Sequence, residues 1–221
     1  NLLIGDMLPI TSFSSDQQTS LNAEQVPTFS NNWEIAVMYG PHGAPDFFTK
    51  QDIDAFFEHS FEVHFNSSRT GIRLIGPKPE WAREDGGEAG LHPSNIHDNA
   101  YAIGAIDFTG DMPIILGPDG PSLGGFVCPA VVVHSELWKL GQLKAGDKVK
   151  FVPIRYEQAT ELNQTYHHML STEHLNDVQF GQSFYAEFDS LNDAVLDRLD
   201  GQDHTPNVVY RPAGNNYMLV E

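Results

Sequence analysis

A series of short apolar segments, each ended by glycine or proline, constrains the fold of this chain most. Residues 61–65 alternate phenylalanine and valine with glutamate and histidine, which is the two-residue period of a half-buried strand. Residues 72–75 stop at Gly76 and Pro77, and residues 126–133 are almost wholly apolar, as in a strand buried on both faces. The 19 glycines and 14 prolines supply many turns between such segments. The sequence therefore predicts a mainly β fold.

Two segments depart from the strand pattern and predict short helices. Thr49 can cap a helix over 49–59, in which apolar residues recur at helical spacing. Ser135 can cap a shorter helix over 135–140. The strands are predicted over 33–38, 61–65, 72–75, 101–108, 112–116, 126–133 and 148–153.

Along the chain, the sequence divides into four parts. Residues 1–32 are interpreted as the end of a preceding unit, with a turn and short strand up to residue 10, followed by a polar linker. Residues 33–157 hold the predicted strands and helices of one β domain. Residues 158–205 begin with a helical pattern and then lose strand periodicity, which predicts a connector. Residues 206–221 predict a β-hairpin that is too small to have a core of its own. The chain also begins without Met, which suggests a piece of a longer protein.

Charge and cysteine content exclude several classes of function. The 12 basic and 30 acidic residues give a net charge of −18, so nucleic acid and anionic membrane surfaces are not expected partners. Cys128 is the single cysteine, which rules out a disulfide framework and a cysteine zinc site. No apolar run approaches about 18 residues and no targeting motif is present, so we expect a cytoplasmic protein.

Polar side chains concentrate in two stretches bounded by glycine and proline, 86–99 and 117–125, with Asp107 between them. Loops of this kind on a β scaffold often carry binding residues, although the same residue types also make ordinary surface turns. The sequence leaves open whether the two stretches meet in space. Their candidate site residues are His92, Asn95, His97, Asp98, Asn99, Asp119, Ser122, Gly124 and Gly125.

Two other kinds of site fit these residues less well. His92 and His97 are five apart with a proline between them, unlike the helical pair of a zinc protease, so no metal site is predicted. Ser94 or Ser122 could serve a Ser-His-Asp hydrolase, but neither lies in a Gly-x-Ser-x-Gly turn.

Two arginines, Arg69 and Arg73, flank a tight turn that precedes and enters an apolar segment. A buried guanidinium needs an acceptor, so each arginine either clamps an anionic ligand or forms a structural ion pair.

Several segments resemble a known family, the allophanate hydrolase subunit 2 family, which is also called KipA-like and includes components of 5-oxoprolinase. A longer signature over 75–99 resembles the carboxyltransferase region of biotin-dependent urea carboxylases, including the urea amidolyases. The resemblance covers about 1–160, and 206–221 resembles the start of the KipI-like subunit 1 half. The shorter matching segments are 68–77, 104–106, 112–116, 124–126 and 137–147.

This resemblance implies a cyclophilin-like β-barrel and a role in carboxylating urea to allophanate. In such enzymes a biotin carboxylase domain uses ATP and bicarbonate, biotin is attached to a separate carrier domain, and this region moves the carboxyl group from carboxybiotin to urea. The isolated chain is then expected to be inactive. The alternatives that remain open are an enzyme component of the 5-oxoprolinase type and a non-catalytic KipA-like regulatory module.

Urea has one acceptor and four N–H donors, so its site needs several oriented acceptors and a donor. On this basis Asn95, His97 and Asp98 are predicted to be catalytic. The substrate contacts are predicted to be His92, Asn99, Arg69 and Arg73, and the contacts to biotin or a developing oxyanion are predicted to be Asp119, Ser122, Gly124 and Gly125.

Overall fold

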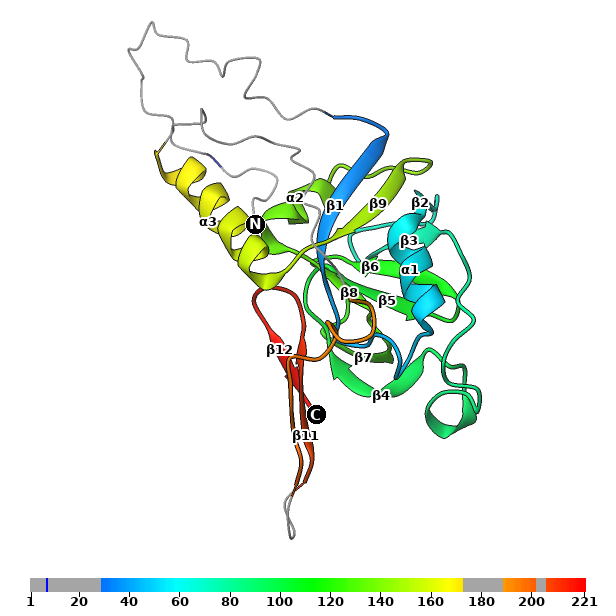
Figure 1. Ribbon diagram of the computed structural model, residues 1–221. Coiled ribbons are helices and arrows are strands. Elements are labelled where there is room, and N and C mark those ends of the chain that lie inside the picture. The colour runs from blue at the N-terminus through cyan, green and yellow to red at the C-terminus, as the bar shows by residue number, and fades with distance from the viewer. Residues whose placement is uncertain (1–6, 8–28, 173–188, 202–205) are drawn as a thin grey trace, which may run out of the picture.

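The computed structural model describes residues 7, 29–172, 189–201 and 206–221. The turn and strand expected within 1–10, the linker up to residue 28 and two parts of the predicted connector, 173–188 and 202–205, lie outside the described residues. Figure 1 shows a barrel with the long helix α3 along one side and a narrow C-terminal sheet that extends away from it.

Seven strands form the closed barrel, which confirms the predicted mainly β barrel fold. Their order around the barrel is β1-β8-β5-β6-β3-β2-β9. The closure is made by β1 and β9, which pair in parallel from Asn32 opposite Lys148 to Val37 opposite Pro153. The strands are β1 (Asn32–Tyr39), β2 (Ser60–Val63), β3 (Gly71–Ile75), β5 (Ala105–Thr109), β6 (Met112–Leu116), β8 (Ala130–Val132) and β9 (Lys148–Pro153).

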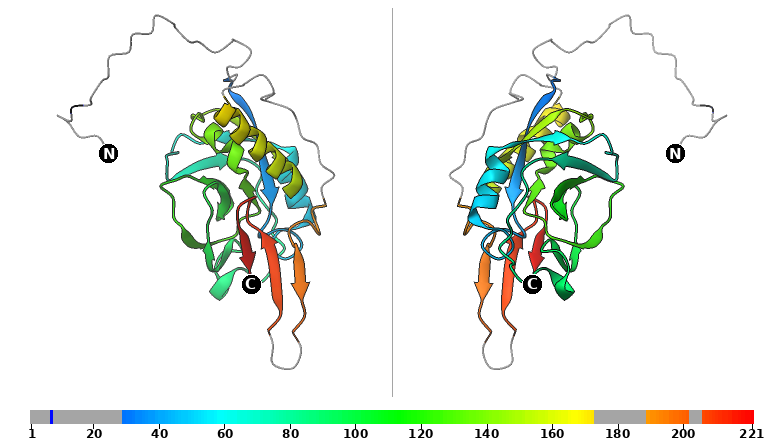
Figure 2. Two further views of the ribbon diagram at one scale, coloured as in Figure 1. Left: turned by 90° about the vertical axis from the view of Figure 1, so that its left-hand side faces the viewer. Right: turned by 90° about the vertical axis from the view of Figure 1, so that its right-hand side faces the viewer.

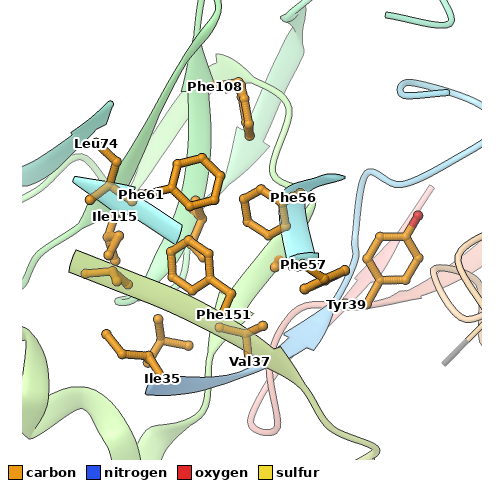
Figure 3. Close-up of a cluster of buried hydrophobic side chains, with 14 of the residues drawn as sticks. Ile35, Val37, Tyr39, Phe56, Phe57, Phe61, Leu74, Phe108, Ile115 and Phe151 are labelled. Carbon is orange, nitrogen blue, oxygen red and sulfur yellow. The ribbon is translucent and has the colours of Figure 1, made fainter. Parts of the chain in front are cut away.

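Aromatic side chains fill the inside of the barrel, and α1 (Lys50–Glu58) closes one end of it. The helix begins with the predicted cap, in which Thr49 accepts from the backbone N–H of Asp52 and the Asp52 side chain accepts from that of Thr49. Phe56 from this helix stacks on Phe151 of β9, with ring centroids 5.0 Å apart (Figure 3). Helix and strands therefore share one core.

Two of the predicted strands are shorter than expected. The strand predicted over 101–108 begins only at Ala105, because Gly104 has a φ of +86° and turns the chain. The segment 126–133 is divided at Pro129, which has no N–H for a ladder bond. As a result β7 (Leu123–Phe126) pairs outside the barrel, while β8 stays within it.

Helical segments lie between β8 and β9 and after β9. The shorter predicted helix is a 3₁₀ turn, η3 (His134–Glu136), that continues into α2 (Leu137–Leu140). α3 (Tyr156–Thr172) lies in the segment interpreted as a connector, and it packs on the outside of the barrel. Its Ala159 and Leu162 contact a small apolar cluster that includes Ala36 and Met38 of β1.

The C-terminal residues form a three-stranded sheet that is fastened to the barrel. The predicted hairpin is β11 (Val208–Pro212) and β12 (Met218–Val220), and β10 (Asp197–Leu199) pairs with β11 on its other side (Figures 1 and 2). Ala194 is buried in the main core, and the hydroxyl of Tyr39 donates to the carbonyl of Ser190 at 2.8 Å. The guanidinium of Arg211 is buried against the turn that follows β1.

Candidate functional site

The two polar stretches meet as neighbouring strands. β4 (Asn95–Ala100) and β7 form a two-stranded antiparallel ribbon in which Asn95 faces Phe126 and Asn99 faces Gly124. The sequence favours loops here, because neither stretch alternates apolar and polar residues. The register shifts between Asn95 and Asn99, so one irregular strand exposes both His97 and Asp98. Figure 1 shows the ribbon at the edge of the barrel.

The two glycines of β7 allow the ribbon to lie close to its neighbours. A Cβ atom on Gly124 would lie 2.6 Å from Cε2 of Tyr101. A Cβ atom on Gly125 would lie 2.8 Å from the carbonyl oxygen of Ile96. The Tyr101 hydroxyl accepts from the N–H of Phe126 at 2.7 Å and lies 3.2 Å from its carbonyl oxygen. Close packing therefore requires glycine at both positions.

A buried polar group lies on the outer face of the barrel near the ribbon. Asp107 of β5 is 4% exposed and Asn99 of β4 is 5% exposed. Among the described residues, the Oδ1 atom of each has no hydrogen-bond partner. Burial raises the pKa of Asp107 to about 7, and the nearby charge of Arg73 opposes this shift. Asp107 can therefore gain or lose a proton near neutral pH.

Asp107 had no predicted role, although the sequence contains a signal for it. It is a single carboxylate within the apolar strand β5, where its neighbours Ile106 and Phe108 are buried on the opposite face. In the sheet, Ile114 of β6 lies opposite both Asp107 and Arg73, so the three residues form one row across the outer face of the barrel. The structure therefore places the predicted substrate contact Arg73 near this carboxylate.

Tyr101 shows that the ribbon and this carboxylate share one electrostatic environment. Burial is the main cause of the raised pKa of Tyr101, and the charges of Cys128, Asp107 and Asp98 add to it. The pKa of the Cys128 thiol is also raised by burial and by Asp107, so this cysteine stays protonated and unreactive. Asp98, which is exposed on the ribbon, thus lies within electrostatic range of the same tyrosine as Asp107.

His92 belongs to a chain of hydrogen bonds beside the ribbon. Its Nδ1 accepts from the N–H of Ser94 at 3.2 Å and lies 3.0 Å from the Ser94 hydroxyl, while its Nε2 lies 3.4 Å from Asp111. Asp111 also accepts from Lys78 at 2.7 Å and from the indole of Trp81 at 3.0 Å. Although its partial burial raises the pKa of Asp111, these bonds lower it below its usual value.

The order serine, histidine, aspartate is therefore present, but its geometry does not suit a hydrolase. Ser94 is 0% exposed, and its hydroxyl oxygen accepts from the N–H of Gly110 at 3.2 Å. A nucleophile must reach the substrate, whereas this hydroxyl is enclosed. The network instead fastens the start of β4 to the turn after β5.

Arg69 and Asp119, which were predicted in two different sets, bind each other. The guanidinium donates to both carboxylate oxygens, at 2.6 and 3.2 Å. Both side chains are exposed, and the hydrogen bond from Arg69 is the main cause of the lowered pKa of Asp119. The backbone of Ser122 accepts from the N–H of Tyr101 at 3.0 Å, and its side chain is exposed.

The described part of the chain shows no group of three metal-binding side chains placed to hold an ion. None of the helices in the described ranges is long and apolar enough to cross a membrane.

A closed barrel with exposed polar groups next to a buried, near-neutral carboxylate defines a domain suited to handling a small polar molecule. Comparison with known proteins agrees with this class. The family described as "Carboxyltransferase domain, subdomain A and B" matches residues 1–153. The chain belongs to this carboxyltransferase family, as the sequence resemblance predicted.

Relatives with assigned names are much longer than this chain. It is 50% identical over 204 residues to a urea amidolyase of Lachancea kluyveri, which covers 90% of this chain and 11% of that protein. It is 43% identical over 231 residues to a urea amidolyase of Saccharomyces cerevisiae, covering all of this chain and 12% of the relative. The crystal structure of Kluyveromyces lactis urea carboxylase matches with a TM-score of 0.83 at 48% identity, over 89% of this chain and 18% of that one.

Proposed function

We propose that this chain is part of the carboxyltransferase region of a urea carboxylase, which transfers a carboxyl group from carboxybiotin to urea and yields allophanate. The family and the relatives named urea amidolyase support this function. The observation that carries the site is the pairing of β4 with β7, which joins the two polar stretches beside Asp107.

The remaining parts of the reaction belong to other domains of the parent enzyme. Biotin is attached to a carrier domain, and a biotin carboxylase domain uses ATP and bicarbonate, both in the same cytoplasmic chain. Within this chain, 33–157 form the subunit 2-type barrel domain, and the hairpin within 206–221 begins the subunit 1-type half. The chain by itself is therefore inactive.

Urea is a neutral molecule that must be held by hydrogen bonds in fixed directions. Its four N–H donors require acceptors, which Asn95, Asp98 and Asn99 provide on one strand. Exposed His97 and the arginines can donate to the urea oxygen. Carboxylation of a urea nitrogen also releases its proton, so an acceptor that titrates near neutral pH is needed. We assign this role to Asp107, because its pKa lies at about 7.

The residues predicted to contact biotin fit that role only in part. The ureido oxygen of biotin needs donors, whereas Asp119 is an acceptor that already binds Arg69. Gly124 and Gly125 are required for close packing. The exposed hydroxyl of Ser122 remains suited to donate. We therefore route no step through biotin, and we expect its other contacts to come from the rest of the parent enzyme.

The experiment is to make Asn95→Ala and Asp98→Ala in the complete enzyme. We expect near-native melting, because truncating a side chain at such a position changes stability by only about 0.5 kcal/mol. Urea-dependent turnover should fall about tenfold or more, because an oriented hydrogen bond that strengthens in the transition state is lost. The bicarbonate-dependent ATPase measured without urea should stay intact.

Asp54→Ala is the matched control, since Asp54 is an exposed carboxylate that pairs with Lys50 on helix α1. It should leave every activity unchanged. Normal urea turnover in both ribbon variants would show that the ribbon is only structural. Early melting of both would show that the two side chains support folding instead of catalysis.

A further inference from the structure

The start of the ribbon is held by Arg83, which lies in the loop before it. Its Nη1 atom donates to the carbonyl oxygens of Pro93 at 3.1 Å and Asn95 at 2.7 Å. These bonds fix the backbone at the first residue of β4, from which the Asn95 side chain projects. The turn between Arg83 and Asn95 is compact, since a Cβ atom on Gly87 would lie 2.6 Å from the Asn95 carbonyl oxygen.

Arg83 is itself positioned by an aromatic ring that a second arginine shares. Its guanidinium carbon lies 5.7 Å from the ring centroid of Phe47, and that of Arg211 lies 5.6 Å from the same centroid. Each contact is favourable, because a guanidinium is attracted to the electron-rich face of a ring. The N–H of Ala82 also donates to the carbonyl of Phe47 at 3.2 Å, so ring and loop are joined twice.

Arg211 comes from β11 of the C-terminal sheet, and its own position is strongly fixed. It donates to Glu221 at 2.7 Å, to Asp46 at 2.8 Å and to the carbonyl of Pro41 at 3.4 Å. Arg198, in the neighbouring strand β10, lies 3.5 Å from the same carboxylate of Asp46. Two strands of the C-terminal sheet thus bind the turn that carries Phe47.

Buried His42 makes this region rigid and keeps it free of a third charge. Its Nδ1 accepts from the N–H of Cys128 at 2.9 Å, and its ring packs edge-on against Phe47 with centroids 4.9 Å apart. Burial, assisted by the charges of Arg211 and Arg83, lowers the pKa of His42 to about 3, so the ring stays neutral. The two guanidinium groups are therefore the cations that flank Phe47 in the described structure.

We propose that Arg83 and Phe47 are positioning residues, through which the docked C-terminal sheet sets the geometry of β4 and of the Asn95 side chain. This inference rests on the proposed function of the ribbon. It adds a physical path that runs from Arg211 through Phe47 and Arg83 to the candidate site. Docking of the C-terminal sheet would then be required for transfer to urea, although no residue of the path contacts urea.

The test is a double-mutant cycle in the complete enzyme, with Arg83→Met, Arg211→Met and both together. A small displacement of groups that orient the substrate costs rate, so we expect each single variant to lower urea-dependent kcat/KM by about tenfold. The double variant should be no worse than the more impaired single one, because both act along one path. The bicarbonate-dependent ATPase without urea should not change in any variant.

Further variants separate positioning from a general loss of structure. Arg83→Lys keeps the charge but loses the forked geometry, so it should restore part of the activity. Arg211→Lys keeps one ion pair and serves if Arg211→Met fails to fold. Lys148→Met is the matched control, because it removes an exposed ion pair with Glu62, at 2.7 Å, away from the path. It should leave turnover and melting unchanged.

Each outcome decides between the two proposals. Multiplicative losses in the double variant, or normal urea turnover in Arg83→Met, would overturn the path. In the Asn95→Ala background, Arg83→Met should lower turnover by less than it does alone, and an undiminished loss would also overturn the path. If Asn95→Ala alone has no effect, the proposed function of the ribbon fails, independently of the path.

Discussion

The inside of the barrel and its outer face beneath the ribbon are both buried, but they differ in chemistry. The inside is filled by aliphatic and aromatic side chains such as Phe56, Phe61 and Phe151 (Figure 3). The outer face holds Asp107 and Asn99, each with an oxygen that has no partner in the described structure. The first region is explained by its contribution to folding, whereas the second is not.

The difference has an energetic sign. Burying a large apolar side chain stabilises the fold by about 1.5–3 kcal/mol, whereas leaving a buried polar atom unpaired costs about 1–3 kcal/mol. A fold selected for stability alone would place apolar residues at both Asn99 and Asp107. A ligand with several N–H groups would satisfy such oxygens, which is the chemistry that urea offers. Unpaired acceptors next to the ribbon are thus better explained by binding than by folding.

The largest effect is expected inside the barrel. Phe151→Ala removes a ring that is 0% exposed and stacks on Phe56, so unfolding should become easier by about 3–5 kcal/mol. Guanidinium unfolding of the chain measures this change. Phe65→Ala is the control, because Phe65 is 82% exposed and its truncation should matter by at most about 0.5 kcal/mol. A loss below about 1 kcal/mol for Phe151→Ala would mean that the core is loosely packed.

An effect of opposite sign is expected on the outer face. The folded-state pKa of Asp107, about 7, lies above its usual 3.8, so the folded chain binds this proton more tightly than the unfolded chain does. Its contribution to stability is therefore complete below about pH 4 and is lost as the pH rises to about 7. Asp107→Asn removes this loss. At pH 8 the variant should be more stable by about 2 kcal/mol, with no gain at pH 4.

Unfolding midpoints at pH 4, 6 and 8 test this prediction. Asp119→Asn is the control, since the pKa of Asp119 is lowered by Arg69 and its substitution should give no gain at pH 8. If Asp107→Asn keeps the pH dependence of the wild-type chain, the carboxylate does not titrate near neutral pH. Its proposed role as proton acceptor would then fail as well.

The barrel was predictable because its strands carry their own signal. Alternation over 61–65 and the apolar runs at 72–75 and 148–153 identify strands and their buried faces. Alternation does not state which strands pair, so the parallel closure of β1 on β9 across more than a hundred residues was not foreseen. A compact sheet follows from local pattern, whereas its closure follows from packing.

The candidate site was predictable only in the residues that it uses. The polar stretch around Asn95 stands out in the sequence, but its pairing with Gly124 does not, because polar and glycine-rich strands lack the alternation that identifies them. Arg83 was missed for a different reason. It acts on the backbone carbonyls of Pro93 and Asn95, and carbonyl acceptors leave no trace in a sequence.

The smallest effect is expected at the exposed pair of Arg69 and Asp119. Arg69→Met removes two short hydrogen bonds, yet both side chains are open to water, where attraction between charges is offset by hydration and screened by salt. The melting temperature should therefore not change measurably, at low salt or at high salt. Thermal unfolding at both ionic strengths measures this, with Asp119→Asn as the reciprocal variant. A clear loss of stability that high salt abolishes would show that exposed charges stabilise this acidic chain. It would then weaken the contrast between exposed pairs and buried groups such as Asp107 and Phe151, in which only the buried groups carry large effects.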